Sequence, residues 1–428
     1  MAQEYENKYD LKAPDGKAFD GFGFSMGVSD DGSVIVASAP YAAVNRKPHV
    51  GKIYIYSRRS CQVIQSVFSI AHQCFGQQLA LSGDGRVIAA TVLHHTELGE
   101  PLYRICMFEY GIGGCRFTQA INMDCMDEFS GITQLALDYT GSHLAVSQSI
   151  HTFCGNPDHG IVRLYEQYGD LYFSSGLLVP DENNDYVHEF GTSLKFNKNG
   201  TIIAVGASSH DGRRSGEGGV YIFATNALSG HRYSTFISPP PELNVTGFGT
   251  NIDISNDGTY LAATSWTTKE NALKAVVGVH FYRLAYRDEQ NVIEPQHDIS
   301  LIPKHDLFGF GVALTGDGVR CAILGFNKAH PELIQQGGVF VIDLTGESKT
   351  GAVYKAAVDD TADTSIRLTM ARNGSLILRG QTSFNIADKE SVGLIQVFMR
   401  NELPAPVKND LKIGYTLVQY TNGINNND

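Results

Sequence analysis

The sequence lacks the features that would place this chain in a membrane, in a secretory pathway or on nucleic acid. It has no apolar run of about 18 residues, so no segment is expected to cross a bilayer. The first residues, MAQEYENKYD, are polar, which predicts a protein made in the cytoplasm without a signal peptide. Lys and Arg number 33 against 45 Asp and Glu, and the resulting net charge of −12 argues against nucleic acid or an anionic membrane as partner.

Cysteine and tryptophan are also scarce. The seven cysteines form an odd number without any C-x-x-C pair, which favours free thiols in a reducing compartment. Neither an H-E-x-x-H motif nor a P-loop occurs. The segment from His151 to His159 gathers His, Cys and Asp, and we interpret it as a polar loop. The sequence therefore predicts no cofactor and no metal site.

A repeated unit is what the sequence does contain. In the stretch from Glu189 to Phe223, Phe190-Gly191 opens an alternating strand, and an apolar strand spans Thr201 to Ala207. Asn199-Gly200 between them reads as a two-residue hairpin turn with φ > 0 at both positions. A third strand begins at Gly219. Such a meander cannot bury both of its faces alone, so it needs copies of itself.

The copies are aligned by their turn glycines, at spacings of 53 to 60 residues. These glycines are Gly32, Gly85, Gly141, Gly200, Gly258, Gly318 and Gly374. A third strand follows each turn, and a weaker fourth strand precedes the next copy. This pattern predicts an all-β protein, a seven-bladed β-propeller of four-stranded antiparallel blades. We expect the propeller to span residues 20–400, between an N-terminal extension (1–19) and a C-terminal extension (401–428).

The N-terminal extension is expected to close the ring. Its segment from Asn7 to Pro14 has the place of a fourth strand and would pair with Leu394 to Phe398, which protects an open edge. The alternatives are a disordered N-terminal arm, or a closing strand formed by Leu411 to Tyr420 in the C-terminal extension.

The repeat resembles the FG-GAP repeat of integrin-α-like propellers over roughly residues 20 to 400. Phe22-Gly23, Ala39-Pro40 and the strand from Gly51 to Tyr56 carry the resemblance in the first copy. FG-GAP blades often carry a calcium loop of D-x-D-x-D-G type, but turns such as SDDGS and NKNGT are too short for such a loop. The resemblance implies an adhesion or receptor-binding module without calcium. The S-x-D-G turns also resemble those of TolB-like propellers.

The two rims of the predicted disc differ. The turns between the first and second strands are short, and Asp31, Asp84, Asp257 and Asp317 fit there as turn residues. The loops after the second strands are long and differ in every copy, so we expect binding there. The candidate contacts are Tyr41, Arg213, Arg214 and Trp266. For the arginines a solvated loop charge remains an alternative, and for Trp266 so does packing between blades.

These observations favour a non-catalytic function. We expect a rigid protein–protein binding disc whose partners are other subunits of a larger assembly, such as the tail or attachment apparatus of a virion. An FG-GAP-type adhesion or receptor-binding module is the first alternative. An enzyme with its site at the channel mouth is the second, although the sequence singles out no catalytic set.

Overall fold

The computed structural model describes most of the chain. The described ranges are 5–57, 60–65, 72–95, 101–123, 131–150, 159–180, 189–211, 215–226, 230–267, 276–287, 292–301, 307–326, 337–345, 351–355, 366–382 and 392–401. Every regular element in these ranges is a β-strand. Within them, no helix has the length and hydropathy needed to cross a lipid bilayer.

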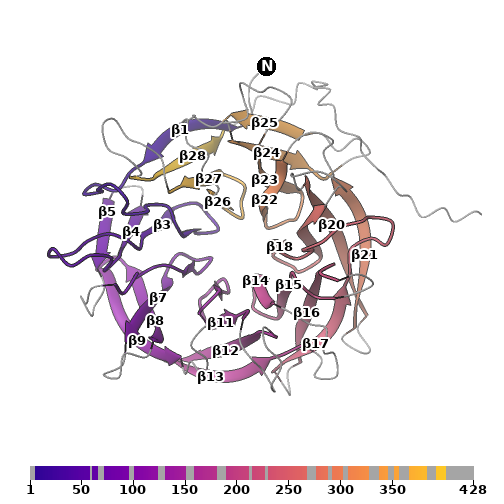
Figure 1. Ribbon diagram of the computed structural model, residues 1–428, viewed down its shortest axis with the longest axis horizontal. Coiled ribbons are helices and arrows are strands. Elements are labelled where there is room, and N and C mark those ends of the chain that lie inside the picture. The colour runs from indigo at the N-terminus through magenta and orange to yellow at the C-terminus, as the bar shows by residue number, and fades with distance from the viewer. Residues whose placement is uncertain are drawn as a thin grey trace, which may run out of the picture.

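Seven four-stranded antiparallel blades surround a central axis (Figure 1). Blades 1 to 3 are β2 (Met26–Val28), β3 (Val34–Ala39), β4 (Lys52–Ser57), β5 (Ser60–Gln65); β6 (Leu79–Leu81), β7 (Val87–His95), β8 (Pro101–Gly111), β9 (Gly114–Met123); and β10 (Gln134–Leu137), β11 (His143–Gln148), β12 (Ile161–Tyr168), β13 (Leu171–Leu178). Blades 4 and 5 are β14 (Phe190–Phe196), β15 (Ile202–Ala207), β16 (Gly219–Asn226), β17 (Gly230–Ile237); and β18 (Ile252–Ile254), β19 (Tyr260–Thr267), β20 (Val276–Arg287), β21 (Val292–Leu301). Blades 6 and 7 are β22 (Leu307–Leu314), β23 (Arg320–Phe326), β24 (Gly337–Asp343), β25 (Gly351–Lys355); and β26 (Ile366–Met370), β27 (Leu376–Gln381), β28 (Leu394–Arg400), β1 (Tyr5–Leu11).

The first and the last strand of the propeller pair in blade 7, which confirms the predicted ring closure by an N-terminal strand. β1 is the outermost strand of this blade and pairs antiparallel with β28, from Tyr5 opposite Arg400 to Leu11 opposite Ile395. In Figure 1 the indigo β1 therefore lies beside the yellow β28. The Tyr5 side chain is fully buried, and its hydroxyl donates a hydrogen bond of 2.7 Å to the carbonyl of Gly374. Leu411 to Tyr420, the alternative closing strand, lies outside the described residues.

The hydrophobic core is divided among the interfaces between blades. The described residues form seven clusters of buried side chains, and each cluster joins residues of two neighbouring blades. The phenylalanine of the Phe-Gly pair anchors several of them. Phe22 and Phe190, for example, are fully buried and make edge-on contacts with Tyr54 and Tyr221. This burial is the physical reason for the repeated Phe-Gly signal in the sequence.

A second repeated glycine explains how closely the blades pack. Gly160 precedes the third strand of blade 3, has φ +78°, and lies against the backbone of Phe190 in blade 4. A Cβ atom at this position would overlap the Phe190 carbonyl oxygen. The same contact recurs between Gly218 and Phe248 and between Gly393 and Phe22. Only glycine allows this approach of two backbones.

The turns between the first and second strands differ from the sequence-based expectation. In each turn the glycine N–H donates to the carbonyl three residues earlier, as Gly200 does to Asn197 at 3.2 Å. Gly200 has φ +70°, whereas Asn199 is not among the residues with positive φ. The prediction of a two-residue hairpin with φ > 0 at both positions was therefore wrong. The chain forms a β-turn that ends on a glycine in the left-handed conformation, and the loop is longer than the predicted two residues.

Candidate functional site

A closed circle of backbone hydrogen bonds surrounds the central channel at the rim that carries these turns. In each blade an N–H of the turn donates to a carbonyl in the turn of the next blade. The seven bonds are Asp30 to Gly83 (2.7 Å), Asp84 to Tyr139 (2.8 Å), Tyr139 to Lys198 (3.0 Å), Lys198 to Asn256 (3.0 Å), Asn256 to Gly316 (2.7 Å), Gly316 to Arg372 (2.7 Å) and Asn373 to Asp30 (3.0 Å). We call this circle the turn ring. It fixes the positions of side chains that project from these turns.

A cavity of about 260 Å³ occupies the channel inside the ring of innermost strands. Its wall combines apolar residues of these strands with a small set of charged side chains. The charged residues are Asp30, Asp138, Lys195, Lys198, Asp253, Arg367 and Arg372. Four of the seven are basic, which contrasts with the net charge of −12 of the whole chain.

Asp253 and Arg372 form a bidentate ion pair across the channel wall. The Arg372 Nη1 and Nη2 atoms lie 2.9 and 2.8 Å from the two carboxylate oxygens of Asp253. Arg372 Nη1 also donates to the Leu314 carbonyl at 3.0 Å, and the Leu314 N–H donates to Asp253 at 2.7 Å. The pair thus links blades 5, 6 and 7. The guanidinium has more donors than these contacts use, so it can still bind a ligand oxygen.

Lys195 is a partly buried amine in the wall of this cavity. It lies in β14, its side chain is only partly exposed, and it has no hydrogen-bond or ion-pair partner among the described residues. Burial lowers the pKa of its ammonium group; Asp253 opposes this effect and Arg372 adds to it. A lysine with a lowered pKa has a larger neutral fraction near neutral pH, which is the form that accepts a proton.

Asp30 and Lys198 occupy the turn-ring end of the cavity. Burial raises the pKa of the Asp30 carboxyl, while Arg372 and Lys198 hold it down. The Lys198 ammonium lies 4.2 Å from the centre of the Tyr139 ring in the neighbouring turn. Charged groups with shifted pKa values in one cavity are typical of functional sites.

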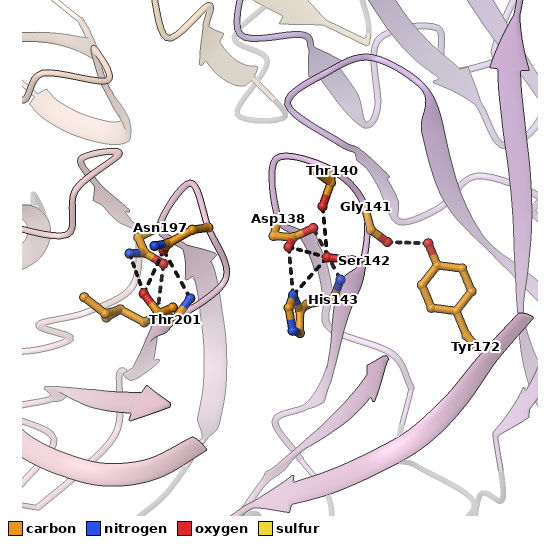
Figure 2. A network of polar contacts seen from close by, with 10 residues as sticks. Asp138, Thr140, Gly141, Ser142, His143, Tyr172, Asn197 and Thr201 are labelled. Carbon is orange, nitrogen blue, oxygen red and sulfur yellow. Dashed lines mark hydrogen bonds and ion pairs between the residues drawn. The ribbon is translucent and has the colours of Figure 1, made fainter. Parts of the chain in front are cut away.

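A polar network in the turn of blade 3 contains Ser, His and Asp but lacks the geometry of a catalytic triad (Figure 2). His143 Nδ1 lies 2.7 Å from Asp138 Oδ2 and 3.2 Å from Ser142 Oγ. In a triad these two partners contact opposite ring nitrogens, whereas here both contact the same one. Tyr172 donates from the outermost strand to the Gly141 carbonyl. The network therefore holds the turn.

The turn aspartates are bonded as their position predicts. Asp31 Oδ1 accepts hydrogen bonds from Ser29 Oγ at 2.7 Å and from the Ser33 N–H at 2.9 Å. Asp84 and Asp257 accept from Ser82 and Ser255 in the same way, both at 2.6 Å.

The structure describes two of the four predicted contact residues, and their role in binding stays a prediction. Tyr41 and Trp266 lie in different blades, and Arg213 and Arg214 lie outside the described residues. Trp266 donates to Thr250 Oγ1 at 3.3 Å and makes an edge-on contact with Phe310 of the next blade, 5.7 Å between ring centres. This contact agrees with the alternative of packing between blades. Tyr41 contacts Phe24 edge-on, also at 5.7 Å.

The sequence reasoning missed the charged residues of the channel. The position five residues before the turn glycine is occupied by Gly27, Ala80, Ala136, Lys195, Asp253, Ala313 and Thr369. Reading the copies column by column would have found two charges where the other copies have small residues. A search for fixed motifs could not find them, because each occurs in one blade only.

A second missed signal is the sequence from Gly23 to Gly27, which fits the G-x-S-x-G pattern. Its serine, Ser25, lines the cavity. The pattern marks a nucleophile in hydrolases where a strand turns into a helix. Here it leads into strand β2, and in the described structure Ser25 has no histidine partner. The described residues also include no group of three or more His, Cys, Asp or Glu able to hold a metal ion.

Comparisons with known proteins find likeness in structure alone. No protein-family model matches the sequence. No curated protein matches it either. A crystal structure of a putative 6-phosphogluconolactonase from Bacteroides uniformis is similar with a TM-score of 0.51 at 13% identity, over 86% of this chain and 92% of that one.

Two further structures are less similar. A periplasmic gluconolactonase from Pseudomonas aeruginosa gives a TM-score of 0.42 at 13% identity, over 78% of this chain and 88% of that one. A hypothetical selenium-binding protein from Sulfolobus tokodaii gives a TM-score of 0.45 at 12% identity, over 78% of this chain and 80% of that one. At 13% identity, the likeness to the Bacteroides structure shows the propeller fold alone. The resemblance to FG-GAP repeats stays a prediction, since no family model matches.

The functional expectation from the sequence needs correction. We expected a non-catalytic interaction disc, or an adhesion module, and no enzyme. The Bacteroides propeller, which shares this fold over most of both chains, is described as a putative lactonase. The expectation was therefore wrong. The physical reason is that enzymes of this architecture can assemble a site from single residues of several blades, which a repeat pattern does not display.

Proposed function

We propose that this protein is a hydrolase that opens a lactone or a comparably small ester in its central channel. The observation that carries the proposal is Lys195, a channel lysine with a lowered pKa beside the fixed Asp253–Arg372 pair. The description of the Bacteroides propeller as a putative 6-phosphogluconolactonase supports the choice of a lactone.

Each residue has a separate role in this reaction. The neutral amine of Lys195 takes a proton from water as the water oxygen adds to the carbonyl carbon. Arg372 stabilises the negative charge that develops on the carbonyl oxygen, and Asp253 holds the guanidinium in place. The bond from the carbonyl carbon to the ring oxygen then breaks. The Lys195 ammonium returns its proton to the leaving alkoxide, so the product is a hydroxy acid and Lys195 is neutral again.

Acid release from small lactones and esters tests the proposal. Purified protein is incubated with δ-gluconolactone, γ-butyrolactone and p-nitrophenyl acetate, and the rates are compared with spontaneous hydrolysis. We expect acceleration of at least one substrate, and a loss of about 100-fold or more in kcat/KM for Lys195→Met. Asp31→Asn is the matched control, because Asp31 caps a turn and does not line the cavity.

Two results would contradict the proposal. No acceleration of any lactone or ester would remove the hydrolase assignment. Equal activity in Lys195→Met and the wild type would move the site away from Lys195.

A further inference from the structure

The side chains two residues before the turn glycines form one level of the channel wall, at the turn ring. All seven turns lie in the described ranges. One acid stands at this level, in blade 1, and all but one of the seven residues line the cavity. In blades 1 to 7 the residues are Asp30, Gly83, Tyr139, Lys198, Asn256, Gly316 and Arg372, of which Gly316 is the exception.

The carboxylate of Asp30 lines the cavity without a hydrogen-bond partner. Asp30 is half-buried, and within the described ranges its side chain takes part in no hydrogen bond and no ion pair. Arg372 and Lys198 act on its charge from a longer distance. The other two acids of the wall, Asp138 and Asp253, are each paired with a basic side chain. Asp30 is therefore the carboxylate of this cavity that is left for a ligand.

A glycine in blade 2 gives the Asp30 carboxylate its place. A Cβ atom at Gly83 would lie 2.8 Å from Asp30 Oδ1 and 2.6 Å from Cδ2 of the Tyr139 ring. Both side chains thus lie against the backbone of Gly83, and the carboxylate stands beside an aromatic ring. Lys198 follows in blade 4, with its ammonium group 4.2 Å from the centre of the same ring. A hydrogen-bond acceptor, an aromatic ring and a donor therefore follow one another around the turn ring.

Asp30 lies across the channel from Lys195. Their blades, 1 and 4, are three places apart in a ring of seven and therefore stand nearly opposite each other (Figure 1). At the level of Lys195, blades 1 to 3 contribute only small residues to the cavity wall, which leaves room between the two groups. These small residues are Gly27, Ala80 and Ala136.

One small ligand can contact both levels. Arg372 belongs to the level of Asp30 and Asp253 to the level of Lys195, yet the atoms of this pair meet at 2.8 and 2.9 Å. The pair also acts electrostatically on both Asp30 and Lys195. A lactone ring whose carbonyl group lies at Lys195 and Arg372 can therefore direct its far edge towards Asp30.

Neutral hydroxyl groups suit Asp30 better than a cationic group does. An ionised carboxylate only accepts hydrogen bonds, and its two oxygens can bind two neighbouring donors. A cationic ligand would be repelled by the basic side chains of the same wall, of which Arg372 and Lys198 already act on Asp30. Donors without charge remain. Hydroxyl groups on adjacent carbon atoms supply two such donors side by side.

We propose that Asp30 determines the specificity of the channel: its carboxylate accepts hydrogen bonds from adjacent hydroxyl groups of the substrate, which is a polyhydroxylated, sugar-like lactone. The identity of this ligand as the substrate rests on the proposed hydrolase function. The binding of hydroxyl groups does not, because it needs only the carboxylate and the space beside it. Asp30 takes no part in the proton transfer by Lys195.

A ligand that cannot be hydrolysed tests the binding of hydroxyl groups. The cyclic polyol 1,5-anhydroglucitol is titrated into the wild type and the variants, and the heat of binding is measured. Tetrahydropyran, the same ring without hydroxyl groups, is the control ligand. We expect the polyol to bind the wild type and tetrahydropyran not to bind. Asp30→Ala should weaken the polyol about tenfold or more, and Asp30→Asn, which keeps one acceptor oxygen, should weaken it less.

The matched control variant is Asp31→Asn. It changes the neighbouring carboxylate, which caps the turn and does not line the cavity. This variant should bind the polyol as the wild type does.

Hydrolysis shows whether the same contact selects the substrate. The lactones δ-gluconolactone and δ-valerolactone have the same ring and differ in their hydroxyl groups. After subtraction of spontaneous hydrolysis, we expect the wild type to prefer δ-gluconolactone in kcat/KM. Asp30→Ala should reduce this preference about tenfold or more, mainly through KM.

The outcomes separate this inference from the proposed function. Equal binding of the polyol by the wild type and Asp30→Ala would overturn the role of Asp30, and so would an equal loss in Asp31→Asn or no binding to the wild type. An unchanged preference between the two lactones in Asp30→Ala would overturn it as well. If Asp30→Ala alone loses the polyol while no lactone is hydrolysed, the hydroxyl-binding site stands and the hydrolase assignment fails.

Discussion

The side chains of Asp138 and His143 make one turn of the rim sensitive to pH. The hydrogen bond of 2.7 Å between them raises the pKa of His143 above 6.5, against the opposing effect of burial. Stabilisation by this pair is fully present below the unfolded pKa of about 6.5 and is lost as pH rises through the folded pKa. We expect His143→Gln to remove on the order of 1 kcal/mol at pH 5.5 and much less at pH 9. Urea unfolding at both pH values measures this difference.

The control for this variant is Ser142→Ala. It removes the hydroxyl beside His143 and leaves the ion pair with Asp138. Its effect should be nearly independent of pH. An equal loss for His143→Gln at pH 5.5 and pH 9 would show that the pair does not titrate as its geometry implies.

The contribution of His280 to stability depends on pH in the opposite direction. It is fully buried between Ser265 and Ser300, with 2.7 Å to each hydroxyl, and burial together with His297 lowers its pKa to about 3. In the unfolded chain His280 becomes protonated near pH 6.5, whereas in the folded chain it stays neutral until the pH approaches 3. The free energy of unfolding therefore falls as the pH drops below 6.5. The slope from this residue is up to about 1.4 kcal/mol per pH unit. Unfolding between pH 7 and 4.5 should show this slope in the wild type and not in His280→Gln; equal slopes would contradict it.

The sequence did not predict the charged residues of the channel. Lys195, Asp253 and Arg372 have no neighbour in the sequence that marks them, because their partners come from other blades. The shift in the pKa of Lys195 is caused by burial in the channel, and burial of this kind depends on the closed ring. The partners of these residues and the lowered pKa of Lys195 could not be derived without placing the innermost strands around one axis.

At the scale of the element, the glycine before the third strand is the most constrained position of a blade. We expect Gly160→Ala to cost about 3 kcal/mol or more, since its Cβ would overlap the Phe190 backbone in the next blade. Gly169→Ala is the matched control: it has φ +62° but nothing within 4 Å of the added Cβ. That change should cost only the backbone strain, about 1 kcal/mol. Thermal unfolding of both variants measures the difference, and equal losses would show that strain and not packing between blades is responsible.

The elements themselves were largely predictable. The Phe-Gly pairs and the apolar second strands are explained by burial, and the turn glycines by their positive φ; the sequence carries each of these signals locally. The conformation of the turn was not predicted correctly. Asn199 can adopt φ > 0, but Asn197 already accepts the Gly200 N–H and orders a longer turn. Hydrogen bonds within the turn decided its type.

At the scale of the whole molecule, closure by β1 should be essential. Removal of residues 1–11 leaves the edge of β28 unpaired and uncovers the packing site of Tyr5, which is fully buried. We expect a loss of several kcal/mol, comparable to large core truncations, or association through the open edge. Size-exclusion chromatography and urea unfolding measure both. A truncated protein that stays monomeric with unchanged stability would contradict closure by β1.

The fold of the whole molecule followed from the repeat, because seven similar units that each need a partner on both faces close into a ring. The function did not follow. The variable rim loops were the predicted binding surface, yet Lys195 with its lowered pKa and the bidentate pair of Asp253 and Arg372 lie in the channel. Repetition made the channel wall look uniform, and the exceptions to the repeat mark the candidate site.

The pH dependence of kcat/KM for lactone hydrolysis, in the wild type and in Lys195→Arg, tests the central claim most directly. The claim is that a neutral Lys195 in the channel transfers the proton. For the wild type we predict a rate that rises with pH through an apparent pKa below the ordinary lysine value of 10.5, after subtraction of spontaneous hydrolysis. Lys195→Arg keeps the positive charge but cannot supply a neutral base, so it should lose both the activity and this inflection. An identical profile in the two proteins would contradict the account.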